Sequence, residues 1–272
     1  MKLTFTKMHG LGNDFIVIDS RVKDVPNLPK VLKRLGDRRF GVGFDQALIL
    51  KKSKKADFRM DIYNSDGTRV EMCGNGIRCF ASYIWSRKLS KKDRLEVETL
   101  AGIIKPEKAG SLVKVDMGEP VLEGSLIPTT RSGPILDFQL EIDVNAFIVT
   151  CVSMGNPHCV VFVADVDGYP VADHGQLIET NPFFPKRTNV EFIEVKDAKT
   201  LKMRVWERGS GETLACGTGA CAATVAASLK GLINRSATVL LPGGKLKINW
   251  ARDNHVYMTG PATEVFTGTV EV

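Results

Sequence analysis

The sequence predicts an α+β fold made of two similar domains, each with strands wrapped around a central buried helix. One observation is an internal repeat, because adding 143 to the residue number carries Cys73 onto Cys216 and Gly74 onto Gly217. A second is strand-like alternation of apolar and polar residues in runs such as "LKMRVWE" and "LVKVDM". A third is residues 217–229, which carry no charge and predict a helix that is buried on all sides.

The repeat continues well upstream of the cysteines. The same shift carries Gly12-Asn13 onto Gly155-Asn156 and Gln46 onto Asn189. Anchors that share one offset at separate places indicate a duplicated unit. In each half an extended run leads through a polar turn to Cys-Gly-x-Gly, and a helical stretch follows. The second helix is expected to end at Lys230-Gly231, which is a typical C-terminal cap.

Composition limits the possible classes of protein. The 272 residues are 43% hydrophobic and 25% charged, which is typical of a globular protein. The net charge of +6 comes partly from short basic runs at 51–55 and 90–94. These runs look like solvated turns and lack interleaved aromatic residues, so nucleic acid is not expected as a partner. A small anionic substrate is an equally good reason for the mild positive field. Neither a signal peptide nor a membrane span is evident, so a cytoplasmic protein without a membrane partner is expected.

The two repeated cysteines are candidates for catalysis. Cys73 and Cys216 stand directly before predicted helix N-termini, where the helix dipole stabilises a thiolate, lowers its pKa and also attracts a carboxylate. The glycines that follow allow a ligand to approach the backbone closely. The alternative is that both are structural cysteines in tight turns, but their matching places in a repeat disfavour it. The remaining cysteines are expected in the core: Cys79, Cys151, Cys159 and Cys221.

No cofactor or metal is expected. The run "GTGACA" at 217–222 fits the dinucleotide fingerprint, but the acidic residue that should follow about twenty positions later is missing. The cysteine spacings lack the flanking histidines of a zinc site. A lysine motif for pyridoxal phosphate is not evident either.

Five motifs in order carry a resemblance to a known family: "HGLGNDF", "YNSDG…MCGNGIRC", "GNPHCVVF", "TNVEF" and "WERGSGETLACGTGACA". Together they resemble the diaminopimelate epimerases, from Leu3 to "GPATEVFTG" near the end of the chain. The resemblance implies two domains, each a barrel-like mixed sheet around a central helix, with the active site in the interdomain cleft. The expected boundaries are 1–117 together with a returning strand 263–272, and 118–262.

The resemblance also implies a reaction, the cofactor-independent conversion of L,L-diaminopimelate to meso-diaminopimelate in lysine and peptidoglycan precursor biosynthesis. Cys73 and Cys216 would serve as thiolate base and thiol acid on opposite faces of one carbon. The two helix N-termini would stabilise the negative charge that develops on the reacting carboxylate. His158 and Glu207 would tune the thiols.

The substrate-binding residues follow from the same resemblance: Asn13, Gln46, Asn64, Gly74, Asn75, Asn156, Asn189, Glu207, Arg208, Gly217 and Thr218. Arg208 can pair in bidentate fashion with the carboxylate of the non-reacting end, and Glu207 can accept from its ammonium. Successive side chains of a strand point to opposite faces, so Glu207 and Arg208 can both reach the substrate only if the turn begins directly after Glu207. A homodimer is expected, with Phe266 as a dimer contact at a position where the family usually has tyrosine.

Two alternatives stay open. Related enzymes such as proline racemase also use two cysteines, and phenazine-type isomerases share the fold. The polar residues Asn64, Asn189 and Arg208 favour diaminopimelate, since a cyclic imino acid with one carboxylate would not need them. From a different class, the paired thiols could form a redox switch in a binding protein.

Overall fold

The chain forms two compact units in a computed structural model that describes residues 1–142 and 144–272. Unit 1 comprises Met1–Val115 and Thr259–Val272, and unit 2 comprises Asp116–Met258. The chain therefore passes from one unit to the other within β9 (Leu112–Asp116) and again within β18 (Val256–Gly260). The sequence placed these boundaries at 117/118 and 262/263.

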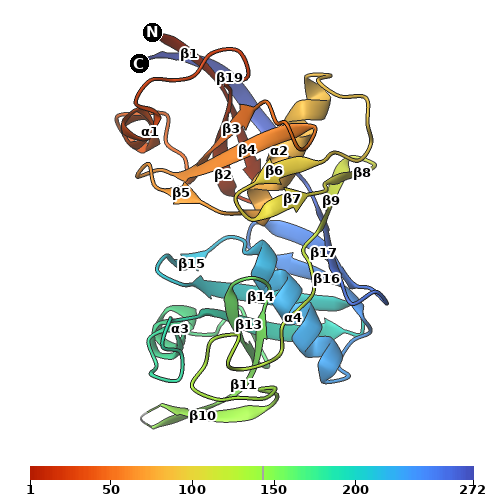
Figure 1. The fold of residues 1–272 in the computed structure, drawn as a ribbon. Helices are drawn as coiled ribbons and strands as arrows, with labels where there is room; N and C mark the ends of the chain where they lie inside the picture. The colour runs from red at the N-terminus through yellow and green to blue at the C-terminus, as the bar shows by residue number, and fades with distance from the viewer. Residues whose placement is uncertain (143) are drawn as a thin grey trace. The chain divides into compact units, whose positions relative to one another are not determined.

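Unit 1 is built on one mixed sheet and two helices. The sheet has the strand order β19-β1-β2-β3-β4-β6-β7, and β5 is added on β4. Its strands are β1 (Lys2–Gly10), β2 (Asn13–Asp19), β3 (Gln46–Lys51), β4 (Phe58–Asn64), β5 (Arg69–Val70), β6 (Val97–Thr99), β7 (Gly102–Ile104) and β19 (Thr263–Glu271). The helices are α1 (Leu28–Gly36) and α2 (Gly74–Ser86). The C-terminal strand β19 pairs antiparallel with β1, which brings the two termini side by side (Figure 1).

Unit 2 repeats this plan with additional strands. Its strands follow the order β10-β11-β12-β13-β14-β16-β17-β18, and β15 is added on β14. They are β10 (Phe138–Ile142), β11 (Asn145–Ser153), β12 (Pro157–Phe162), β13 (Asn189–Asp197), β14 (Thr200–Glu207), β15 (Gly211–Thr213), β16 (Ser236–Leu241) and β17 (Gly244–Trp250). The helices are α3 (Val171–Glu179) and α4 (Gly217–Leu229). A short hairpin, β8 (Glu107–Ala109) with β9, precedes unit 2.

The internal repeat is present in the register of the strands. In unit 1 the parallel pair β2–β3 places Phe15 beside Gln46. In unit 2 the parallel pair β12–β13 places His158 beside Asn189, which is the same pairing shifted by 143 residues. The bounds of α2 and α4 are related by the same shift. The predicted α+β fold with two pseudo-symmetric domains is thus confirmed, although both sheets are open within the described part of the chain rather than closed barrels.

The central helices are buried, as the sequence predicts. Residues Ala220 to Ala227 of α4 are all fully buried, because small side chains let the helix pack on β11, β12, β13, β14, β16 and β17. The helix ends in a Schellman motif, in which Gly231 has a φ of 70° and the Leu232 N–H donates to the Ala227 carbonyl at 3.0 Å. In unit 1, α2 packs on β1, β2, β3 and β19.

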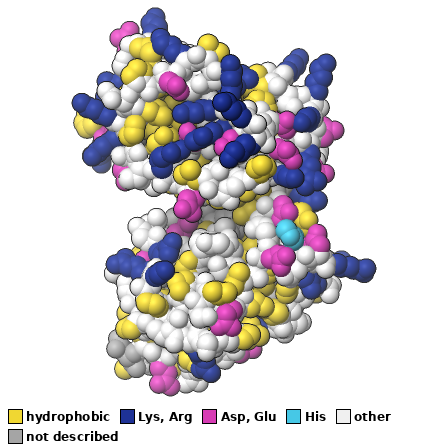
Figure 2. Space-filling model, viewed as in Figure 1, with side chains coloured by type: hydrophobic (Ala, Val, Ile, Leu, Met, Phe, Trp, Pro, Cys, Tyr) yellow, Lys and Arg dark blue, Asp and Glu magenta, His cyan; other side chains and the backbone are white. Residues whose placement is uncertain are grey.

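The basic runs form solvated loops rather than one continuous binding surface. Lys52, Lys54 and Lys55 are exposed between β3 and β4. In the second run, Lys92 pairs with Asp57 at 2.6 Å, so part of its charge is neutralised. On the face drawn in Figure 2, Lys and Arg side chains are interspersed with Asp and Glu. Among the described residues, no helix is both long enough and apolar enough to cross a membrane.

Candidate active site

Cys73 caps the N-terminus of α2. Its backbone is extended, with φ −142° and ψ 117°, and its sulfur accepts from the Gly76 N–H at 3.4 Å. A cap accepts one of the helix's unsatisfied N–H groups, so the sulfur lies at the positive end of the helix dipole. Gly74 and Asn75 are the first residues of the helix and are buried. This agrees with the predicted position of the thiol beside a helix N-terminus.

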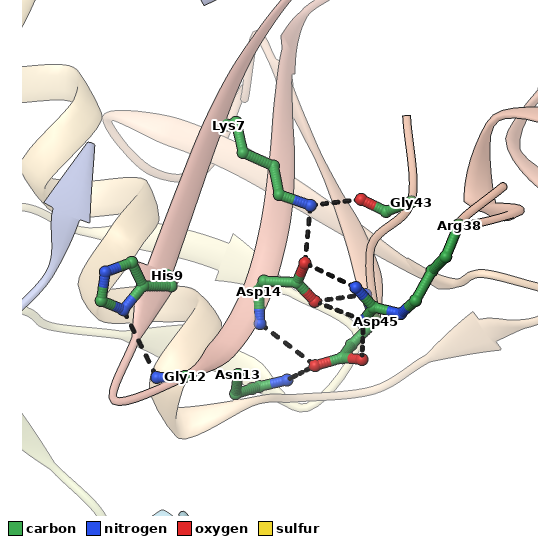
Figure 3. A network of polar contacts seen from close by, with 8 residues as sticks. All are labelled: Lys7, His9, Gly12, Asn13, Asp14, Arg38, Gly43 and Asp45. Atoms are coloured by element: carbon green, nitrogen blue, oxygen red, sulfur yellow. Dashed lines mark hydrogen bonds and ion pairs between the residues drawn. The ribbon is translucent and has the colours of Figure 1, made fainter. Parts of the chain in front are cut away.

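Asn13 lies beside Cys73. A network of charged side chains holds Asn13 in place (Figure 3). Its Oδ1 is 3.8 Å from the Cys73 sulfur and accepts from Asn75 Nδ2 at 3.3 Å. Its Nδ2 donates to Asp45 Oδ2 at 2.8 Å. Arg38 in turn bonds to Asp45 at 2.6 Å. The network therefore orients the amide so that its carbonyl oxygen faces the thiol.

The same network contains a second carboxylate, Asp14. Arg38 bonds to it through both terminal nitrogens, at 2.7 and 3.1 Å, and Lys7 bonds to it at 2.6 Å. Burial raises the pKa of Asp14, but the hydrogen bonds from Arg38 and Lys7 outweigh burial and lower its pKa to about 2. Asp14 is therefore an anion at neutral pH, and it fixes Arg38 in the position from which it reaches Asp45.

Gln46 and Asn64 are neighbours on adjacent strands. They lie opposite each other in the β3–β4 pair, and Gln46 Nε2 donates to Asn64 Oδ1 at 3.1 Å. Asn64 donates in turn to the Thr68 hydroxyl at 3.0 Å. The structure thus brings together, within unit 1, the predicted residues Asn13, Asn75 and Cys73 in one group, and Gln46 and Asn64 in another.

Cys216 occupies the repeat-equivalent position in unit 2. It is the N-cap of α4, with φ −118° and ψ 114°, and is only 5% exposed. Its sulfur lies 3.5 Å from the Thr218 hydroxyl oxygen. Gly217 and Thr218 form the first turn of the helix, as expected.

The structure corrects the expected low pKa of Cys216. Burial raises the pKa of this thiol well above its ordinary value, and the negative charges of Glu207 and Glu191 raise it further. Hydrogen bonds from Thr218 and the Gly219 N–H act in the opposite direction but are weaker. The helix dipole alone therefore does not decide the protonation of this sulfur, and Cys216 is a thiol at neutral pH in this structure.

His158 and Asn156 lie together in unit 2. His158 is fully buried, and its Nε2 is 3.0 Å from Asn156 Oδ1. Its Nδ1 is 2.7 Å from Glu191 Oε1, and Glu191 is also fully buried. The expected histidine is therefore one member of a buried chain of polar groups.

Glu207, Arg208 and Asn189 are arranged at the end of β14. The strand ends at Glu207, so the turn begins directly after it, as predicted. The backbone N–H of Arg208 donates to Asn189 Oδ1 at 2.9 Å. The Arg208 side chain is exposed and donates to the Lys186 carbonyl at 3.2 Å, and it forms no ion pair with a carboxylate among the described residues. Its guanidinium is thus available for an external carboxylate.

The other four cysteines belong to the core, as predicted: Cys79, Cys151, Cys159 and Cys221 are all fully buried. Burial raises the pKa of Cys79 to about 12. It also raises the pKa of Cys159 well above its ordinary value, and the neighbouring Cys151 adds to the effect. Neither is therefore a thiolate at neutral pH.

Several residues of these groups were missed in the sequence, including Asp14 and Arg38. Asp45 precedes Gln46, Glu191 lies in "TNVEF", and Arg78 follows the glycine-rich turn. Arg78 is fully buried and donates to Asn75 Oδ1 at 2.9 Å, so it orients a predicted binding residue. A charged residue within an apolar strand or helix is the signal that could have identified Glu191 and Arg78. Asp45 carries no comparable signal, because polar residues are ordinary in a loop.

The remaining predictions concern metals and the dimer. No cluster of three or more His, Cys, Asp or Glu suited to a metal occurs in the described ranges. Phe266 lies on β19, is 48% exposed and packs edge-on against Phe5, with ring centroids 6.0 Å apart.

The fold is shared with solved structures of low sequence similarity. The Bacillus anthracis phenazine biosynthesis protein of the PhzF family superposes with a TM-score of 0.72 at 16% identity, covering 100% of both chains. A hydroxyproline epimerase from Agrobacterium vitis superposes with a TM-score of 0.69 at 14% identity, covering 99% of this chain and 92% of the other. The two-unit architecture therefore occurs in solved structures that share little sequence with this chain.

Sequence comparison gives the family. The family model described as diaminopimelate epimerase matches residues 5–123 and 150–265. A diaminopimelate epimerase of Moorella thermoacetica is 54% identical, covering 97% of this chain and 98% of its own length. One of Acetivibrio thermocellus is 52% identical, covering 99% of each. The chain belongs to the diaminopimelate epimerase family.

Proposed function

We propose that this protein interconverts L,L- and meso-diaminopimelate without pyridoxal phosphate, metal or nicotinamide. The observation that carries the proposal is the placement of Cys73 and Cys216 as N-caps of repeat-equivalent helices in a member of this family. Inversion of a carbon requires removal of a proton from one face and delivery of another to the opposite face. Two thiols from a duplicated fold meet this requirement.

The division of roles follows from the environment of each sulfur. Cys216 enters the reaction as the protonated acid, because burial and two carboxylates raise its pKa. In the direction in which Cys216 gives up its proton, Cys73 is the base. In the reverse direction the two thiols exchange roles. The N–H groups at the start of α2 and α4 hold the reacting carboxylate, where charge builds up in the transition state. The two units are accordingly the N- and C-terminal epimerase domains.

The non-reacting end of diaminopimelate carries its own ammonium and carboxylate, and the polar residues select for them. Arg208 pairs with the carboxylate, and Glu207 accepts from the ammonium. The other binding residues are Asn13, Gln46, Asn64, Gly74, Asn75, Asn156, Asn189, Gly217 and Thr218. Glu207 has a second role, since its charge also raises the pKa of Cys216. His158 is the other residue that we expect to tune the thiols.

We also propose a cytoplasmic homodimer. The edge strand β19 exposes Val265 (55%) and Phe266 (48%), and such exposed apolar side chains on a strand favour association. The measurement is sedimentation of the purified protein with a Phe266→Lys variant as comparison. A parent protein that sediments as a monomer at micromolar concentration contradicts the dimer.

The activity is tested by incubating reduced, chelator-treated protein with L,L-diaminopimelate in heavy water. We expect meso-diaminopimelate to form and the inverted α-carbon to carry deuterium, since the proton delivered comes from a solvent-exchanged thiol. Proline and alanine serve as control substrates. An activity that needs added metal or pyridoxal phosphate, or that prefers proline, contradicts the proposal. Thiol oxidation without any turnover would instead favour the redox switch.

A further inference from the structure

A buried ionisable pair lies under the first turn of α4. His158 on β12 and Glu191 on β13 are both fully buried, and His158 Nδ1 is 2.7 Å from Glu191 Oε1. Glu191 also lies close to the helix, since a Cβ added at Gly219 would be 2.6 Å from Glu191 Oε1. The other carboxylate oxygen, Oε2, has no hydrogen-bond partner among the described residues. The pair thus lies directly behind the turn that begins at Cys216.

The duplicated unit has an apolar pair at the same two positions. Subtracting 143 carries His158 onto Phe15 and Glu191 onto Leu48, and both are fully buried. The strand registers agree, because Val17 pairs with Leu48 in unit 1 as Val160 pairs with Glu191 in unit 2. The contacts with the helix agree as well. A Cβ added at Gly76 would be 3.1 Å from Leu48 Cδ2 and 3.4 Å from Phe15 Cε1.

The polar pair is therefore not a requirement of the fold. Phenylalanine and leucine fill the equivalent space under α2, and replacing a buried ion pair by apolar residues of similar volume is commonly neutral or stabilising. Polar groups at such a position cost desolvation energy unless they are hydrogen-bonded. A pair that stability does not need, placed behind a reactive cysteine, indicates a role in the site.

We propose that Glu191 is a positioning residue that holds His158 in one orientation, and through it the Asn156 amide, on the Cys216 side of the reaction only. An ionised carboxylate can only accept hydrogen bonds, so His158 Nδ1 carries a proton and the ring cannot turn over. His158 Nε2, which lies 3.0 Å from Asn156 Oδ1, then has no proton and can only accept a hydrogen bond, so it favours the Asn156 orientation in which the amide NH₂ group takes the place of Oδ1. Phe15 and Leu48 form no hydrogen bonds with their side chains, so the residues behind Cys73 differ chemically from those behind Cys216. The consequence for turnover rests on the proposed function.

The orientation of His158 is tested by nitrogen NMR of histidine-labelled protein at pH 8 without substrate. The chain has four histidines, and His158→Phe assigns the signal. We expect protonated Nδ1 in the parent and a mixture of tautomers in Glu191→Leu. An Nδ1 without a proton in the parent, or a His158 signal that is the same in both proteins, overturns the proposal. This readout needs no turnover, so it decides the matter even if the protein does not act on diaminopimelate.

The consequence for turnover is tested with three variants. In Glu191→Gln, which keeps an acceptor, kcat is expected to fall about 3- to 10-fold, and in Glu191→Leu more than about 100-fold, with KM within about threefold. The double variant His158→Phe/Glu191→Leu places the apolar pair of unit 1 at the equivalent positions of unit 2. It is expected to fold with an unchanged or raised Tm and to lose as much kcat as Glu191→Leu. Glu194→Gln on the same strand is the control and should keep the parent rate. A double variant with parent kcat overturns the proposal.

Discussion

The Asn13 side-chain amide donates to Asp45 Oδ2 at 2.8 Å, and this bond determines which end of the amide faces Cys73. A carboxylate only accepts hydrogen bonds, so the NH₂ group must face Asp45 and the carbonyl oxygen must face the thiol, 3.8 Å away. Arg38 bonds to the second oxygen of Asp45, and Asp14 holds Arg38 from the other side (Figure 3). A residue that the sequence did not single out thus orients one that it did.

Asp45→Asn should reduce activity by releasing this orientation. The new amide can donate as well as accept, so Asn13 can turn its NH₂ group toward the thiol. We expect kcat/KM to fall about 3- to 10-fold, as for a partly exposed charged hydrogen bond, with little change in Tm. The control is Asp24→Asn, which removes the same charge from a side chain that is 83% exposed. Equal rates for the two variants would contradict the orienting role.

Loss of either catalytic thiol should abolish epimerisation. In Cys73→Ala or Cys216→Ala one face of the substrate carbon has no proton donor or acceptor, so the rate of inversion should fall at least about 100-fold. The measurement is formation of meso-diaminopimelate by each variant. Cys221→Ala, in the same helix as Cys216, is the control and should keep most of the activity. Inversion at near-parent rate by either single variant contradicts the two-base mechanism.

Arg208→Lys should weaken recognition of the non-reacting carboxylate. Lysine keeps the charge but loses the bidentate geometry of the guanidinium. We expect a loss of about 1–3 kcal/mol in kcat/KM, or roughly 5- to 150-fold, and a larger loss for Arg208→Ala. Arg187→Lys is the control, since that guanidinium is 60% exposed and its nearest carboxylate partner, Glu179, is 3.5 Å away. Parent rates in both Arg208 variants would show that selection occurs elsewhere.

The pH dependence should respond to Glu207. Burial raises the pKa of Cys216, and the charge of Glu207 raises it further, with Glu191 as the other carboxylate and His158 behind it. When Cys216 acts as the acid, activity is present below its pKa and is lost as the pH rises through it. Glu207→Gln removes a negative charge and lowers that pKa. The falling limb of kcat/KM against pH should therefore move to lower pH, and a limb that stays in place or moves upward contradicts the assignment.

The glycines of the two turns should differ in how they tolerate alanine. A Cβ at Gly219 would lie 2.6 Å from Glu191 Oε1, whereas a Cβ at Gly76 has no neighbour closer than Leu48 Cδ2 at 3.1 Å. Gly219→Ala must push a buried carboxylate away from His158, so we expect about 1–3 kcal/mol of lost stability, as for overpacking in a core. Gly76→Ala should cost less, because an apolar side chain can shift. Denaturant unfolding of both variants measures the difference, and equal losses contradict it.

Much of the fold could be predicted because it repeats. Cys73 and Cys216, Gln46 and Asn189, and the two uncharged helix starts recur at one offset, and strand registers preserve that offset. The cap at Gly231 was predictable as well, because its conformation depends on residues nearby in the chain. The open sheets were not, since closure depends on which strands lie at the edges. That depends on long-range pairing, such as β19 with β1.

The sequence by itself determined the family, the two thiols and the plan of two similar units, because local patterns and motif order encode them. Only the tertiary structure decided the environment of those thiols. Glu191 and Glu207 approach Cys216 from two strands and, together with burial, raise a pKa that the helix dipole alone would lower. Asp45 and Asn13 are 32 residues apart and meet only because β2 and β3 pair side by side. Electrostatic interactions depend on distance and burial in space, and neither is written in the order of residues along the chain.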